Sequence, residues 1–151
     1  MNGKKEGTIS SKTKLVDVVS YEGLVPGETY TLAGMLYLKS TGKPLLVGGQ
    51  PVISTKEFIA EERNGEVKVE FAFDSSNLAG QTIVVFENLT SRSIKVATHS
   101  DINSESQAVF MKNPFIQTGD TKKLALYGGI FGTSLAVFIW AVFPRIRKRH
   151  F

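Results

Sequence analysis

The side chains that could do chemistry in this sequence are few, and His99 is the first candidate. Histidine is the side chain whose unperturbed pKa lies nearest neutrality, so His99 could take a proton from a hydroxyl nucleophile. Asp101 follows shortly after it, and a Ser or Thr hydrolase could use such a pair. The sequence has no nucleophile elbow and no glycine-rich oxyanion loop, so we do not expect a hydrolase.

Metal and cofactor sites are not expected either. Asp101, Asn103 and Glu105 resemble the opening of a calcium-binding loop. That loop needs glycine at its sixth position and glutamate at its twelfth, where this sequence has Ser106 and Lys112. The chain contains no cysteine, which excludes a disulfide framework and the common cysteine-ligated zinc sites.

The elements that must position these residues are short strands. Residues 30–39 alternate with a period of two, which places Tyr30 and Leu32 on one face and Thr31 on the other. Residues 67–73 alternate in the same way, and the Asn64-Gly65 dipeptide before them is typical of a tight hairpin turn. Further turns are marked by Pro26-Gly27 and by residues 40–43, and residues 82–86 and 93–98 complete a run of about seven strands. The sequence therefore predicts an all-β fold, an immunoglobulin-like antiparallel β-sandwich.

Basic residues are concentrated at the C-terminal end of the chain. Four of its 18 lysines and arginines lie after residue 143, which leaves 14 against 14 acidic residues in the rest of the chain. A nucleic-acid-binding domain should carry a basic stripe on its folded face. The neutral body therefore argues against nucleic acid as a partner.

Residues 124–143 form an uncharged stretch, and a helix of that length spans about 30 Å, the thickness of a bilayer core. Tyr127 and Trp140 lie near its two ends, where aromatic rings favour the membrane interface. A buried core helix is the alternative, but it gives no role to the basic residues that follow. We expect a single transmembrane helix at residues 121–143, followed by a cytoplasmic tail at residues 144–151.

The charges on either side of this stretch predict its orientation. The tail outweighs Lys122 and Lys123, so residues 1–120 should lie outside the cell. The first residues lack the apolar region of a secretory signal, so we expect the chain to be the C-terminal piece of a longer exported protein. The tail's basic residues are Arg145, Arg147, Lys148 and Arg149.

The linker at residues 112–120 leads directly into this stretch. A Thr-Gly pair, a hydrophobic span and a basic tail in that order resemble the cell-wall sorting signal of Gram-positive surface proteins. That resemblance implies a sortase that cleaves between Thr and Gly and joins the Thr carbonyl to a peptidoglycan or pilin amine. The usual pattern is Leu-Pro-x-Thr-Gly, and an uncut juxtamembrane linker remains the alternative. The corresponding residues here are Phe115, Ile116, Gln117, Thr118 and Gly119.

Taken singly, Glu87, His99 and Gln107 have ordinary explanations as surface or strand residues, but their order with other motifs is specific. Residues 17–30 read DVVSYEGLVPGETY, residues 84–87 read VVFE, and His99 begins HSDIN. Together these strings resemble the repeat module of Gram-positive adhesins that is named for its Val-x-Phe-Glu (VaFE) motif and is also called the Thr–Gln ester-bond domain. The resemblance covers nearly all of residues 10–111.

The resemblance implies a covalent cross-link that forms without an enzyme. In the family, a Thr hydroxyl on the first strand attacks the carboxamide of a Gln on the last strand, which releases ammonia and leaves an ester. By motif, His99 is the base, Glu87 and Asp17 are a carboxyl pair that shares a proton, and Gln107 is the acceptor. Thr8 and Thr13 are candidates for the nucleophile. A Thr-bearing strand upstream of Met1 is the other possibility, with residues 2–6 as the turn after it.

The resemblance implies a structural stalk module at residues 1–111 of a cell-surface adhesin or pilin-like protein, with no cofactor and at most a single-turnover reaction. Its partners would be the membrane, a sortase and the cell wall, with a host ligand bound through N-terminal domains. Two alternatives remain open. The module could itself bind a carbohydrate or host protein without a cross-link, or Glu87 could promote an isopeptide bond between a Lys and an Asn.

Overall fold

The alternation of side chains along β3 (Thr29–Leu38) shows how the sequence builds its sheets. Tyr30, Leu32, Gly34 and Leu36 are buried, while the residues that alternate with them are half-exposed. In the computed structural model, which describes residues 5–114, 130–131 and 137–140, this strand pairs antiparallel with β9 (Thr82–Ser91). Together the two strands form the centre of the larger sheet.

The larger sheet has seven strands within the described residues. Its order runs β1–β11–β9–β3–β4, while β10 adds to β9 and β7 adds to β3. The parallel pair is β1 with β11, and the other pairs are antiparallel. The strands not yet given bounds are β1 (Lys5–Thr8), β4 (Lys43–Pro44), β7 (Ile53–Ile59), β10 (Ile94–His99) and β11 (Ala108–Lys112).

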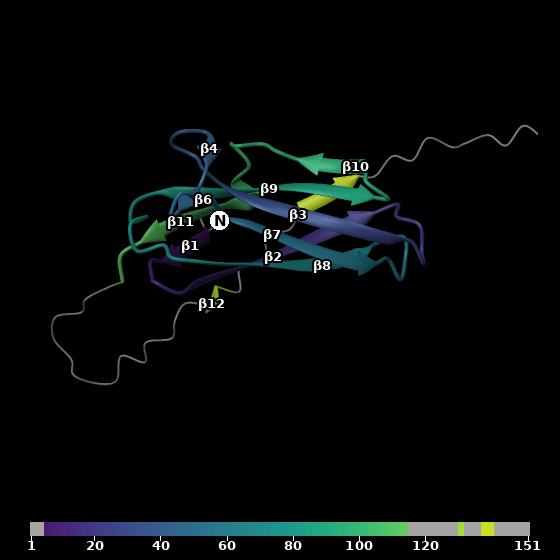
Figure 1. Ribbon diagram of the computed structural model, residues 1–151, viewed down its shortest axis with the longest axis horizontal. Helices are drawn as coiled ribbons and strands as arrows, with labels where there is room; N and C mark the ends of the chain where they lie inside the picture. The colour runs from purple at the N-terminus through teal and green to yellow at the C-terminus, as the bar shows by residue number, and fades with distance from the viewer. Residues whose placement is uncertain (1–4, 115–129, 132–136, 141–151) are drawn as a thin grey trace, which may run out of the picture.

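The smaller sheet is built on β2 (Thr13–Glu22), which pairs antiparallel with β8 (Gly65–Phe73). Figure 1 shows β2 and β8 lying beneath β3 and β9 of the larger sheet. The short strands β5 (Leu46–Val47) and β6 (Gln50–Pro51) form a separate hairpin.

One hydrophobic core fills the space between the two sheets. It takes inward residues from both, including Leu15, Val19 and Phe71 from the smaller sheet and Leu32 and Leu89 from the larger. The described residues contain no α-helix, only a 3₁₀ turn at Glu105–Gln107. The prediction of an all-β fold is therefore confirmed.

Two of the three predicted turns are present in the structure, and the third is not. Gly27 (φ 84°) and Gly42 (φ 66°) adopt the left-handed conformation that their turns require. The prediction of a tight hairpin at Asn64-Gly65 is wrong, because β7 before it pairs with β3 and β8 after it pairs with β2. The chain crosses between sheets here, and the Asn64 side chain instead accepts a hydrogen bond from the Gly23 N–H.

The predicted transmembrane helix at residues 121–143 lies mostly outside the described residues. Two segments within it are described, β12 (Ile130–Phe131) and β13 (Val137–Trp140), and both are strands that pair parallel with β2. Residues 130–131 and 137–140 are therefore strands in the described structure, and the transmembrane helix stays a prediction. Because β8 covers only one edge of β2, the other edge offers unpaired backbone groups to these strands. No helix in the described part of the chain has the length and apolarity to cross a bilayer.

Candidate functional site

Two strands and the 3₁₀ turn before a third each place a carboxyl or carboxamide side chain in an inward row that is mostly apolar. Asp17 lies between Leu15 and Val19 on β2, and Glu87 lies between Val85 and Leu89 on β9. The alternation that directs their apolar neighbours inward directs these two carboxyls inward as well. Gln107 begins a third such row, which continues through Val109 and Met111 on β11.

The structure brings Asp17, Glu87 and Gln107 together in the space between the sheets. All three are fully buried, with relative exposures of 0%. Gln107 Nε2 donates a hydrogen bond to Glu87 Oε2 at 3.3 Å. A buried carboxamide held against a buried carboxyl is the arrangement that the predicted acceptor and acid require.

Burial sets the protonation of the two carboxyl groups. Loss of water, followed by interaction with Asp17, raises the pKa of Glu87 from 4.5 to about 10. Burial also raises the pKa of Asp17, opposed by its hydrogen bond with Glu87 and by the charges of Lys5 and His99. Glu87 is therefore the member of the pair that holds a proton at neutral pH, because two neighbouring buried carboxyls resist ionising together.

A shared proton also explains the unsatisfied oxygens of the pair. Counted as two carboxylates, Asp17 and Glu87 offer only acceptors, and both Asp17 oxygens and Glu87 Oε1 lack a partner among the described residues. One proton turns Glu87 into a donor toward Asp17 or toward the amide. Gln107 Oε1 is also buried without a partner, so it is the oxygen to which a neutral acid could donate.

His99 joins this group from the neighbouring strand. It lies directly opposite Glu87 in the β9–β10 pair, so the two side chains share a face of the sheet. Its Nε2 atom is buried and has no hydrogen-bond partner within the described ranges. An imidazole nitrogen without a partner is available to accept a proton.

The structure does not bring the predicted nucleophiles to this site. Thr8 lies opposite Lys112 in the β1–β11 register, five positions beyond Gln107, or roughly 16 Å along the strand. The Thr13 hydroxyl is buried against Ser75 Oγ at 2.5 Å, on a different strand from the acceptor.

Lys5 is a residue of this site that the motifs do not indicate. Its Nζ donates to the backbone oxygen of Ser106, the residue before Gln107, at 2.5 Å. Burial lowers the pKa of Lys5, while Asp17 acts in the opposite direction. Only the parallel pairing of β1 with β11 reveals this position, and alternation within β1 gives no sign of it.

Gly34 closes the site on the side of β3. It pairs with Glu87 across the sheet, and a Cβ at Gly34 would lie 2.5 Å from Cζ of the Phe71 ring. Glycine thus lets this ring from the opposite sheet reach β3 at the position that pairs with Glu87. An apolar ring packed here helps to exclude the water that would otherwise lower the pKa of the acid.

The predicted sorting and topology residues, residues 115–119 and the basic residues of the tail, lie outside the described residues. The calcium-loop candidate at Asp101 forms a local turn, in which its Oδ1 accepts the N–H of Asn103. Within the described ranges, no group of acidic and histidine side chains is arranged to hold a metal ion.

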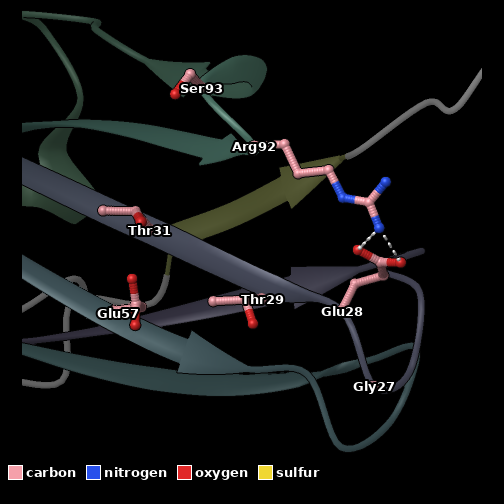
Figure 2. A pocket seen from close by; sticks show the side chains of 7 residues that line it. All are labelled: Gly27, Glu28, Thr29, Thr31, Glu57, Arg92 and Ser93. Atoms are coloured by element: carbon pink, nitrogen blue, oxygen red, sulfur yellow. Dashed lines mark hydrogen bonds and ion pairs between the residues drawn. The ribbon is translucent and has the colours of Figure 1, made fainter.

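A separate hollow of about 550 Å³ lies at the Thr29 end of β3, and neither member of the buried carboxyl pair lines it (Figure 2). Arg92 crosses its rim to pair with Glu28 at 3.0 Å and 3.1 Å. None of its lining residues is aromatic, so it offers no surface for stacking a ring. The residues that line it are Gly27, Glu28, Thr29, Thr31, Glu57, Arg92 and Ser93.

Comparison with known families covers most of the chain. The model of the T-Q ester bond containing domain matches residues 1–111. The chain belongs to this family.

Solved structures share only a general likeness with the chain. A bacterial adhesin from Mobiluncus mulieris containing intramolecular disulfide, isopeptide and ester bond cross-links aligns in two crystal forms, each with TM-score 0.49 and 17% identity. The alignment covers 68% of this chain and 47% of the adhesin chain, so this chain spans less than half of that structure. An alternative pilotin from the type II secretion system of Vibrio cholerae aligns with TM-score 0.45 and 12% identity, over 88% of this chain and 99% of the pilotin. No curated protein matches the sequence.

Proposed function

We propose that this chain is a structural stalk module of a cell-surface adhesin or pilin-like protein, stabilised by an ester bond that it forms between a Thr and Gln107. The observation that carries this proposal is the burial of the Gln107 carboxamide against Glu87, whose partner Asp17 completes a carboxyl pair. Membership of the T-Q ester bond family supports it. An immunoglobulin-like topology of the two sheets is part of the same proposal.

The proposed reaction uses each member of the site once. His99 takes the proton of the Thr hydroxyl, and the oxygen attacks Cδ of Gln107. Glu87, neutral because its pKa is raised to about 10, donates toward the carboxamide oxygen as negative charge develops there. The Cδ–Nε2 bond then breaks, the nitrogen takes up the proton that His99 received from the Thr hydroxyl, and ammonia leaves.

The Thr belongs on the segment beside Gln107, where β1 pairs with β11. Because Thr8 lies five positions too far along this register, we propose that the Thr precedes Lys5 on polypeptide upstream of residue 1. Joining the first strand to the last closes a loop of about 100 residues, worth about 4 to 5 kcal/mol in the chain-entropy model. A pull on the two chain ends would then pass through a covalent bond, which is the use of a stalk.

The experiment is mass spectrometry of the polypeptide extended upstream with its natural sequence. We expect a mass lower by one ammonia, a Thr-containing peptide joined to the Gln107 peptide, and release of that link by hydroxylamine, which cleaves esters. Gln107→Met, which keeps the bulk and removes the carboxamide, should restore the full mass. The unmodified mass in the extended protein would contradict the proposal.

We also propose that residues 112–151 anchor the module. The uncharged stretch at residues 124–143 would hold the chain in the membrane until a sortase cuts between Thr118 and Gly119. Mass spectrometry of wall-released protein should then find a C-terminus at Thr118 joined to a wall or pilin amine. Recovery of chains that retain residues 119–151 would contradict the proposal.

Strands β12 and β13 cannot pair with β2 and span a membrane at the same time. If residues 121–143 serve only as a membrane span, deleting residues 121–151 should leave the unfolding midpoint of the module unchanged in detergent-free buffer. A clear loss of stability would show instead that these strands support β2.

A second candidate function is ligand binding by the module itself. Tyr37 and Phe86 stack on the outer face of the larger sheet, with ring centroids 4.0 Å apart, and both are only half-buried. A partly exposed aromatic pair of this kind can contact a sugar or a protein. Glycan-array binding that is lost in Tyr37→Ser, with the cross-link intact, would favour this function over the stalk.

A further inference from the structure

Lys5 lies on the face of β1 that looks toward the buried site. In the parallel β1–β11 pair it stands opposite Val109, whose side chain is 2% exposed, and paired residues direct their side chains to the same face. Gln107 precedes Val109 by two positions and therefore shares that face. Lys5 on β1 and Gln107 in the 3₁₀ turn before β11 therefore lie on the same side of the sheet, two register positions apart.

The amine of Lys5 is held close to the acceptor. Its Nζ donates to the backbone oxygen of Ser106, one peptide bond from Gln107. Lys5 and Asp17 also interact electrostatically. In the described part of the chain, neither Thr8 nor Thr13 lies beside Gln107, whereas the Lys5 amine contacts the residue directly before it.

We propose that Lys5 is a second nucleophile for Gln107 and that the chain forms a Lys5–Gln107 isopeptide bond when no Thr strand occupies the site. The Nζ lone pair forms a bond to Cδ of Gln107, and the Cδ–Nε2 bond breaks. One proton moves from Nζ through the carboxyl pair to Nε2, which leaves as ammonia. The inference rests on the roles proposed above for Gln107 and Glu87, but it does not depend on a Thr.

Three features of the site favour this reaction. Gln107 Oε1 is buried and unpartnered among the described residues, so it is free to accept a hydrogen bond from neutral Glu87 as charge develops on it. Asp17, the ionised member of the pair, can take a proton from the amine. Burial lowers the pKa of Lys5, which raises the fraction of amine that is uncharged and nucleophilic.

The experiment uses the full 151-residue chain, purified and incubated at neutral pH, with intact mass and tandem mass spectrometry as readouts. We expect the mass to fall by one ammonia and a branched peptide to join Lys5 to Gln107. Because the bond is an amide, hydroxylamine should leave it intact. Lys5→Arg should restore the full mass, since a guanidinium stays protonated at any accessible pH. The control Lys12→Arg, at an exposed turn residue, should keep the mass loss.

Each other outcome overturns the inference. An unmodified mass for the 151-residue chain contradicts it, and so does a mass loss that persists in Lys5→Arg. Glu87→Gln keeps the size of the acid and should also block the reaction, and circular dichroism of both variants checks that they fold. A different result would contradict the proposed ester: the extended polypeptide would show no hydroxylamine-sensitive link between a Thr and Gln107.

Discussion

The buried carboxyl pair predicts an unusual dependence of stability on pH. The pKa of Glu87 is raised from 4.5 to about 10 in the folded state, so between these values the folded protein holds a proton that the unfolded chain has lost. Stability should therefore fall as the pH rises, by about 1.4 kcal/mol for each pH unit. Between about pH 5 and pH 8 the loss comes to about 4 kcal/mol. Most surface carboxylates with depressed pKa values have the opposite sign.

The test compares two proteins that both carry Gln107→Met, so that no cross-link forms. One keeps Glu87 and the other carries Glu87→Gln. A glutamine amide supplies the donor that the shared proton supplied, and it does not titrate, so the dependence on pH should flatten. Urea unfolding at several pH values gives the free energy of unfolding directly. Glu57→Gln, at an exposed position, is the matched control and should leave the slope unchanged. An equal slope with and without Glu87 would refute the assignment of the proton to Glu87.

Two further substitutions test the packing around the site. Gly34→Ala should lower the free energy of unfolding by about 1 to 3 kcal/mol, because its Cβ would meet the Phe71 ring at 2.5 Å; denaturant titration measures this, and an unchanged midpoint would contradict it. Ser75→Ala should cost about 1 to 3 kcal/mol, because the buried hydroxyl of Thr13 would lose its 2.5 Å partner and the Ser10 N–H its 3.0 Å acceptor. Thermal unfolding checks it, and a loss no larger than that of an exposed Ser11→Ala control would count against this network.

Local alternation predicted most of the strands but not how they pair. Residues 30–39 and 67–73 could be recognised as strands because their apolar residues recur with a period of two. The Asn64-Gly65 dipeptide is compatible with a turn whichever sheet the following strand joins. The sequence therefore predicts a hairpin there that the structure does not form. Which sheet a strand joins depends on partners far away in the chain, and a local pattern does not contain that information.

The site was predicted by motif, although a physical signal for part of it was also present. The inward row of β9 passes from Val85 to Leu89 through Glu87, so the alternation alone places this carboxyl in the core. The position of Lys5 had no such signal, because it depends on the parallel register of β1 with β11. That register also separates Thr8 from Gln107.

The central claim is that Gln107 is the acyl half of an internal covalent bond. A crystal structure of the purified protein at near-atomic resolution tests this most directly. The account predicts continuous electron density from Cδ of Gln107 to a Thr oxygen or to Nζ of Lys5, with no amide nitrogen remaining on Gln107. A free carboxamide at Gln107, hydrogen-bonded to Glu87 and bonded to nothing else, would contradict it.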